Sequence, residues 1–187
     1  MNLFIRLLRT IIANLIFRKK VGYLDETVLK FRVWITDQDA FQHMNNSRYL
    51  SIADLSVIDT LLKTRQAYSM RREGIIPVVV YKHVSLFRML KFPQSYEVRT
   101  QITGWEGNYT FFQHDFVRRG KLYARAMTVG RLVRTGGRNP TVEEAAEICG
   151  WKDVPPSPPI TDEQRRIIDN LEAARQEAKQ PVPEEVA

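Results

Sequence analysis

Residues 37–63, DQDAFQHMNNSRYLSIADLSVIDTLLK, contain the features that decide the fold. The stretch begins with a polar segment that includes Asp37, Asp39 and His43, and residues 48–63 then follow with the spacing of a helix. Apolar side chains cover most of this helix and leave a narrow polar stripe. The stripe consists of Ser56, Asp59, Thr60 and Lys63. Because so little of the helix is polar, the flanking segments must supply a sheet that covers it.

The segments on both sides of the helix have the composition of β-strands. Residues 28–36 precede the helix, and alternating, β-branched and aromatic segments follow it. The later strands are expected at residues 78–90, 96–104, 109–119 and 121–135. Arg119-Gly120 is a turn signal between the last two. One long helix and a run of closely linked strands predict an α+β fold, in which an antiparallel sheet wraps the central helix.

The chain divides by composition into three parts. We expect an amphipathic helix in residues 1–22, a central domain in residues 23–136, and helical extensions in residues 137–187. The C-terminal part combines a short helix that starts at Thr141, a proline-rich linker, a charged helix and a mobile tail.

The N-terminal segment has one apolar face, basic residues and no acidic residue. The face consists of Phe4, Leu8, Ile11, Ile12 and Leu15. Residues 1–20 contain five basic residues, which suits a helix lying on an anionic membrane. A helix packed on the protein's own body or on a partner subunit explains the pattern equally well. We therefore expect a cytoplasmic protein, with peripheral attachment to the inner face of the membrane as one of the two alternatives.

The overall composition excludes several classes of protein. With 187 residues, 44% of them hydrophobic, the chain has the composition of a globular protein. The single cysteine, Cys149, excludes a disulfide framework and a multi-cysteine zinc site. The net charge of +7 comes largely from the N-terminus, and no nucleic-acid motif occurs, which argues against a nucleic-acid partner. Neither a metal-ligand spacing nor a phosphate-cradling glycine loop is present, so we expect no metal and no cofactor.

The polar segment before the helix has the residue types that acyl transfer requires. A carboxylate can act as a general base or as a nucleophile. A helix that begins near Asn45 or Asn46 presents unpaired amides to a developing oxyanion, and His43 can bond a carbonyl or a water. Aspartate and asparagine also favour turns and helix caps for structural reasons alone, so this segment is either a reactive site or an ordinary capped loop.

Asp54 is the other acidic residue that stands out. It lies on the apolar face of the helix with Leu50, Val57 and Leu61. An acid in such surroundings needs a partner or acquires a raised pKa. Asp54 is therefore a candidate catalytic residue or one half of an ion pair.

The motif D-x-D-x-x-x-H-x-N-N-x-x-Y at residues 37–49 resembles that of the 4-hydroxybenzoyl-CoA thioesterase-like hotdog acyl-CoA thioesterases. The matching positions are Asp37, Asp39, His43, Asn45, Asn46 and Tyr49. The resemblance covers about residues 27–136, and the order of elements agrees with the hotdog fold. It implies hydrolysis of an acyl-CoA or acyl-carrier thioester to a carboxylic acid and a free thiol. It also implies a homodimer or homotetramer with its site at the subunit interface.

The resemblance assigns roles to individual residues. Asp39 corresponds to the catalytic carboxylate, and the backbone amides at Asn45 and Asn46 correspond to the groups that polarise the thioester carbonyl. Asp54 rivals or assists Asp39, because some hotdog thioesterases place the carboxylate on the central helix. Asp37 then has a structural role, and Tyr49 is a packing residue. An apolar acyl pocket is expected from Val57, Ile58, Val80 and Phe112.

Two departures from the family pattern keep alternatives open. Gln42 stands where many relatives have glycine, and residues 106–108 lack the basic cluster that grips CoA in some relatives. CoA would then be held weakly or by other basic residues. The candidates are Arg88, Lys91, Arg118 and Arg119. One alternative is a non-catalytic acyl-binding or interaction module, and the other is a hotdog dehydratase that pairs His43 with Asp54.

Overall fold

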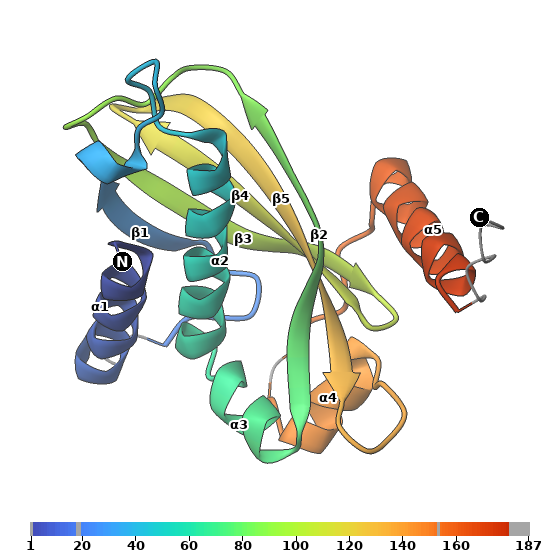
Figure 1. Ribbon diagram of the computed structural model, residues 1–187. Coiled ribbons are helices and arrows are strands. Elements are labelled where there is room, and N and C mark those ends of the chain that lie inside the picture. Colours follow the sequence, from blue (N-terminus) through green and yellow to red (C-terminus); the bar gives the residue numbers. More distant parts are fainter. Residues whose placement is uncertain (1, 18–19, 153, 180–187) are drawn as a thin grey trace, which may run out of the picture.

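A computed structural model describes residues 2–17, 20–152 and 154–179, and Figure 1 shows its arrangement. The N-terminal half contains α1 (Asn2–Phe17), β1 (Thr27–Arg32), the single 3₁₀ turn η1 (Ile35–Asp37), α2 (Asn46–Lys63) and α3 (Gln66–Arg72). The C-terminal half contains β2 (Ile75–Leu86), β3 (Ser95–Glu106), β4 (Tyr109–Arg118), β5 (Lys121–Arg134), α4 (Val142–Cys149) and α5 (Asp162–Glu177).

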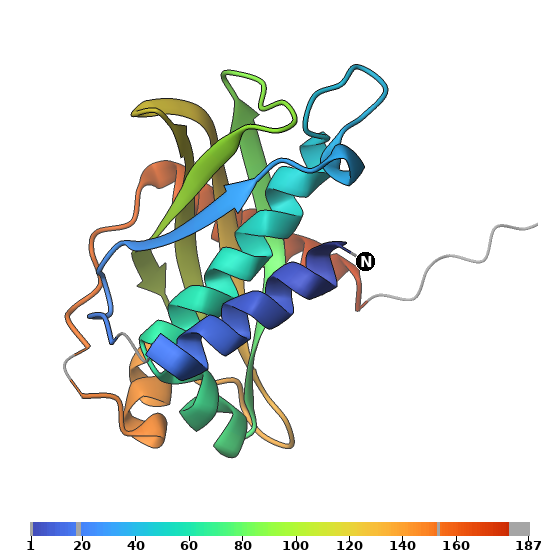
Figure 2. The same ribbon diagram turned by 90° about the vertical axis from the view of Figure 1, so that its left-hand side faces the viewer.

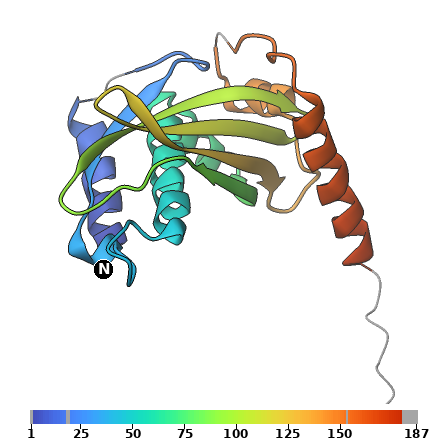
Figure 3. The ribbon, with the colours of Figure 1, turned by 90° about the horizontal axis from the view of Figure 1, so that it is seen from above.

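The five strands form one antiparallel sheet in the order β1-β3-β4-β5-β2, and this sheet curves around α2 (Figures 1 and 3). The predicted α+β hotdog fold, with a central helix wrapped by an antiparallel sheet, is confirmed. Because β1 and β2 are the two edges, β2 has one side without a neighbouring strand in the described chain.

Several element boundaries differ from those expected. The first strand ends at Arg32 rather than at residue 36, because η1 begins at Ile35 and turns the chain. Helix α3 was not expected; Arg65, with a φ of +61°, separates it from α2. Strand β2 begins at Ile75 and ends at Leu86 rather than spanning residues 78–90, and it contains a register shift between Val79 and Tyr81, where it pairs with β5.

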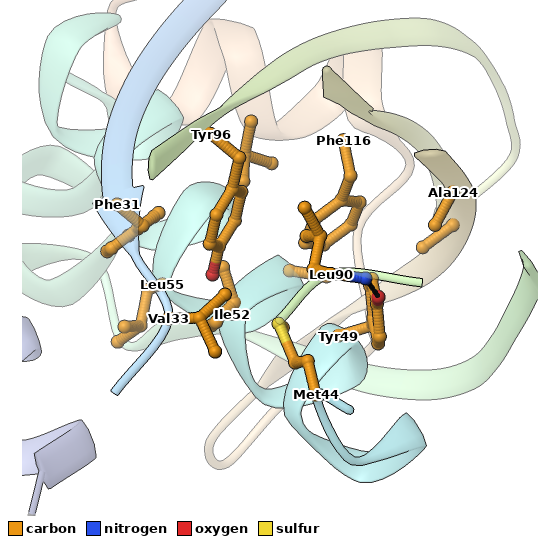
Figure 4. Close-up of a cluster of buried hydrophobic side chains, with 13 residues drawn as sticks. Phe31, Val33, Met44, Tyr49, Ile52, Leu55, Leu90, Tyr96, Phe116 and Ala124 are labelled. Carbon is orange, nitrogen blue, oxygen red and sulfur yellow. Dashed lines mark hydrogen bonds between the residues drawn. The ribbon is translucent and has the colours of Figure 1, made fainter. Parts of the chain in front are cut away.

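The inward face of α2 builds the main core with the upper part of the sheet (Figure 4). Tyr49 is buried at the start of the helix, and its ring meets the edge of Phe116 with centroids 5.1 Å apart. Its hydroxyl accepts a hydrogen bond of 3.4 Å from the amide of Leu90. Tyr49 therefore packs as the resemblance implies, and it fixes the beginning of α2 against the sheet.

The polar stripe of α2 is buried at Ser56, Asp59 and Thr60, which the helical pattern did not predict. Asp59 and Thr60 are each only 1% exposed. Asn14 of α1 donates a 2.7 Å hydrogen bond to Asp59, and Thr27 of β1 lies 2.8 Å from Thr60, hydroxyl to hydroxyl. The stripe is covered because α1 lies beside α2 on the side of β1 (Figures 1 and 3).

Helix α1 packs on the body through a face that combines polar residues with Leu3 and Leu7. Arg6 and Thr10 are buried, and Asn14, one further turn along, bonds to Asp59. The predicted apolar face points outward, with Phe4 68% and Leu15 66% exposed. The helix does pack on the protein's own body, but with the face opposite to the apolar one. Within residues 2–17, 20–152 and 154–179, no helix has the length and hydropathy needed to cross a membrane.

Helix α5 covers the opposite face of the sheet, whereas α4 belongs to the same buried cluster as Val57 and Leu61 of α2. In Figure 2, α1 and α2 lie in front of the strands and α5 lies behind them. Side chains of α5 pack against Phe111 and Val129, and Val80 joins this outer cluster. Val80 therefore does not face α2, so the prediction that it lines a pocket with Val57 and Ile58 was wrong. The tail expected at residues 180–187, like Arg18 and Lys19, lies outside the described residues.

Candidate active site

The loop before α2 is closed around the carboxylate of Asp39. The Asp39 amide donates a 2.9 Å hydrogen bond to the carbonyl of His43. The amides of Phe41 and His43 donate to Asp39 Oδ1 at 2.9 Å and 3.2 Å. Among the described residues, nothing donates to Oδ2. The loop thus fixes the orientation of the half-buried carboxylate and leaves one oxygen available for chemistry.

Gln42 occupies a backbone position that favours glycine. Its φ is +60°, in the left-handed region, where a side chain other than glycine costs about 1–2 kcal/mol. The turn forms here with glutamine in place of glycine. The Gln42 carbonyl accepts a hydrogen bond of 2.5 Å from the side chain of Gln38, which helps to hold this conformation.

Asp37 is the structural centre of the segment. Its side chain is 0% exposed, and Arg6 Nη2 lies 2.5 Å from Oδ2. The amide of Trp34 donates to the same oxygen at 2.9 Å, and the carbonyl of Asp37 accepts from the Asn45 amide at 2.9 Å. Arg48 Nε lies 3.8 Å from Oδ1. Asp37 therefore joins α1, the end of β1 and the start of α2.

The first turn of α2 offers one free amide. Asn45 caps the helix, and its side chain accepts from the Ser47 amide at 2.9 Å. The Asn45 amide is already bonded to Asp37, whereas the Asn46 amide has no acceptor among the described residues. The helix dipole places partial positive charge at this end. Of the two amides expected to polarise a carbonyl, the one at Asn46 is available.

The three histidines have different surroundings. His43 is half-buried, and its backbone closes the Asp39 loop. His83 is exposed and lies 3.1 Å from Ser85, from Nε2 to Oγ. His114 is buried between Thr100 and Thr128, and burial, aided by the charge of Lys82, lowers its pKa to about 3. Among the three, only His43 belongs to the loop of Asp39.

Asp54 lies apart from this loop, beside an apolar cavity of about 210 Å³. The cavity is lined by Asp54, Val57, Ile58, Leu61, Pro77, Val79, Phe112, Thr128 and Gly130. Lys82 Nζ lies 2.6 Å from the carboxylate of Asp54, so this acid has the partner that its position required. Val57, Ile58 and Phe112 line the cavity as expected. Its residues come from α2 and from β2, β4 and β5.

Sequence reasoning missed two partners of these acids, Lys82 for Asp54 and Arg6 for Asp37. Lys82 is one lysine in a long strand, and nothing local relates it to Asp54. Arg6 did carry a signal, because Arg6, Thr10 and Asn14 follow each other at intervals of four residues on one side of α1. That spacing marks a polar face, but only contacts show that the face is turned inward.

A basic groove of about 660 Å³ lies along the edge strand β1, next to α1. Its basic residues are Arg9, Lys30, Arg32, Arg99, Arg118 and Arg119. Arg118 and Arg119 were among the candidates for holding CoA phosphates. Arg88, another candidate, instead donates a 2.7 Å hydrogen bond to the carbonyl of Leu122. The groove is suited to phosphate-bearing ligands.

Two comparisons with known proteins match most of this chain. A family profile described as the thioesterase-like superfamily matches residues 33–187. Protein THEM6 of Drosophila melanogaster is 25% identical over 133 residues, which span 70% of this chain and 68% of that protein.

Solved structures show the same fold. Protein TT1821 of Thermus thermophilus has a TM-score of 0.59 at 20% identity, covering 68% of this chain and 98% of its own. A 1,4-dihydroxy-2-naphthoyl-CoA thioesterase of Synechocystis has a TM-score of 0.58 at 12% identity, covering 70% of this chain and 100% of its own. At these identities the likeness establishes the fold.

Proposed function

Because this chain belongs to the thioesterase-like superfamily and is a thioester hydrolase, we propose that it hydrolyses acyl-CoA with Asp39 as the reacting carboxylate. The observation that carries this proposal is the free Oδ2 of Asp39 on the loop that leads into α2. The same loop ends at the unoccupied Asn46 amide. A carboxylate and an oxyanion donor from one short segment are the minimum that thioester hydrolysis requires.

The chemistry follows one of two routes. In the first, Asp39 removes a proton from water as the water attacks the thioester carbonyl, and the C–S bond breaks to release the thiolate, which is then protonated. In the second, Oδ2 attacks the carbonyl and expels the thiolate, and water then hydrolyses the mixed anhydride. In both, the Asn46 amide bonds the oxyanion, and a donor of this kind contributes about 3–4 kcal/mol to the transition state.

The acyl chain fits best in the apolar cavity beside α2, and the CoA phosphates fit the basic groove. Asp54 is a second candidate for the carboxylate because it borders this cavity. Its pairing with Lys82 favours Asp39, since the Lys82 ammonium already occupies the carboxylate of Asp54. The same pair weakens the dehydratase alternative, in which Asp54 works with His43.

We propose that two copies assemble along β2. This edge strand carries exposed apolar side chains, among them Ile76, Val78 and Leu86. An exposed apolar edge strand is a surface on which another strand pairs. A second copy would also cover the cavity, because Pro77 and Val79 of β2 line it. Analytical ultracentrifugation of the full chain tests this, and a monomer throughout the concentration range would contradict it.

Thiol release from a panel of acyl-CoA and acyl-carrier-protein thioesters tests the proposed reaction. We expect one free thiol for each carboxylic acid formed. Binding of acyl-CoA by calorimetry without thiol release would instead identify a non-catalytic acyl-binding module. An enoyl product from a 3-hydroxyacyl thioester would identify a dehydratase, and either outcome would contradict hydrolysis.

We also propose that α1 attaches the protein to the inner, anionic face of a membrane. The outward face of α1 is apolar over its whole length, and Leu8 and Ile12 lie on it between Phe4 and Leu15. The basic groove lies next to this helix, and Arg9 and Lys30 line it. Apolar side chains for the acyl region and cations for the headgroups are the two contributions that hold an interfacial helix.

Replacing Leu8 and Leu15 together with glutamine tests the membrane proposal. Full burial of a leucine side chain in the membrane contributes about 1.5–3 kcal/mol of binding free energy. We therefore expect vesicle affinity to fall by about tenfold or more. Co-sedimentation with phosphatidylcholine–phosphatidylglycerol vesicles measures the effect. The matched control is Tyr68→Gln, an exposed aromatic on α3. Equal pelleting of both variants and the parent would contradict membrane attachment through α1.

A further inference from the structure

Arg6 is the contact through which α1 reaches the loop of Asp39. The family match begins at residue 33, so Arg6 and the whole of α1 lie outside it. Arg6 is only 7% exposed, and its guanidinium lies 5.7 Å above the ring of Phe31. It donates to the carboxylate of Asp37 at 2.5 Å and to the carbonyl of Arg32 at 3.0 Å. Arg6, from a helix outside the family match, thus contacts Asp37 in the segment before α2.

Asp37 connects Arg6 to the residues on both sides of the loop. Its side chain accepts from the Trp34 amide, and its carbonyl accepts from the Asn45 amide that precedes the free amide of Asn46. The side chain of Asp37 is 0% exposed, and a buried carboxylate holds its geometry only with a charged or hydrogen-bonding partner. Arg48 also lies near Asp37, but its Nε is 3.8 Å away and another of its nitrogens donates to the carbonyl of Thr36, so Arg6 makes the shorter contact.

We propose that Arg6 is a positioning residue of the active site. It holds Asp37, and through Asp37 it fixes where the Asp39 carboxylate and the Asn46 amide lie relative to one another. This inference rests on the proposed function, because it assigns Arg6 to the loop that carries out the hydrolysis. Arg6 does not touch the substrate; it acts through Asp37.

The other contacts of α1 provide a way to separate positioning from simple docking. Asn14 ties α1 to α2 through Asp59, and Arg9 donates to the carbonyl of Lys30 at 3.0 Å. Neither contact involves residues 37–46. Loss of either weakens the attachment of α1, whereas loss of Arg6 also removes the 2.5 Å contact to the carboxylate of Asp37.

The experiment compares Arg6→Ala and Arg6→Lys with the matched control Asn14→Ala. For Arg6→Ala we expect kcat to fall about a hundredfold with KM near that of the parent, since misplaced catalytic groups lower kcat on this scale. Arg6→Lys keeps the charge without the forked geometry, so its kcat should lie between those of the parent and Arg6→Ala. Asn14→Ala should keep the parent's kcat. Activities are normalised to the folded fraction measured by near-ultraviolet circular dichroism.

Amide hydrogen exchange of residues 38–46 supplies a readout that does not depend on turnover. Faster exchange in this loop for Arg6→Ala, and not for Asn14→Ala, supports positioning. Equal effects of the two variants on kcat and on loop exchange would overturn it, because Arg6 would then only dock α1. If Asp39→Asn proves fully active, the proposed function fails, while loop exchange still reports whether Arg6 orders the segment. Arg6→Lys retains the positive charge beside Asp37, so we expect it to fold and to supply the comparison if Arg6→Ala unfolds.

Discussion

Replacing Asp39 with asparagine should lower kcat by about 10²- to 10⁴-fold, the range that a positioned acid or base contributes. An amide side chain neither removes a proton from water at a useful rate nor attacks a thioester. The fold should survive, because the asparagine carbonyl oxygen can accept the two loop amides that Asp39 Oδ1 accepts, from Phe41 and His43. Thiol release measures the rate, and thermal unfolding verifies that the variant is folded.

The matched control is Asp54→Asn. This substitution removes the other candidate carboxylate and its ion pair with Lys82, in which both side chains are partly exposed. We expect turnover close to that of the parent and a small change in stability, since partly exposed ion pairs contribute about 1 kcal/mol or less. The reverse pattern, with Asp54→Asn inactive and Asp39→Asn active, would move the reaction to the central helix. Full activity of both variants would exclude either carboxylate from the chemistry.

The loop and α2 could be predicted because their signals are local. The turn residues, the cap at Asn45 and the apolar spacing of the helix all act within about one turn of the chain. The strands were found for the same reason, since alternation is a property of neighbouring residues. The residues at which the strands end were predicted less accurately. At the end of β1, for example, the Val33 amide donates to the carbonyl of Gln94, which lies more than 60 residues away in the sequence.

The orientation of α1 could not be predicted in this way. Amphipathic spacing shows which residues share a face, but not which face meets the protein. Here the polar face is turned inward because Asp37 and Asp59 are buried and need partners, and α1 supplies Arg6 and Asn14. The contact between Asn14 and Asp59 also explains why the polar stripe of α2 is covered by α1. Pairs such as these join distant segments, so they leave little trace in either segment alone.

We expect His114 to make the free energy of unfolding depend on pH. It is 0% exposed, and its two ring nitrogens lie 2.9 Å and 3.1 Å from the hydroxyl oxygens of Thr100 and Thr128. Burial, with a smaller contribution from the positive charge of Lys82, lowers its pKa from 6.5 to about 3. The folded protein therefore keeps this ring neutral at pH values where the unfolded chain has already bound a proton.

The stability linked to His114 is fully present above pH 6.5 and is lost as the pH falls from 6.5 towards 3. In this range the group should lower the ratio of folded to unfolded protein by about tenfold for each pH unit. His114→Gln keeps hydrogen-bonding groups between the two threonines but cannot titrate. Urea unfolding from about pH 7 to about pH 4 should give a shallower pH dependence for this variant, although it starts from a lower stability. His83→Gln, which changes an exposed histidine, should keep the parent's slope, whereas equal slopes for His114→Gln and the parent would show that His114 is not the residue responsible.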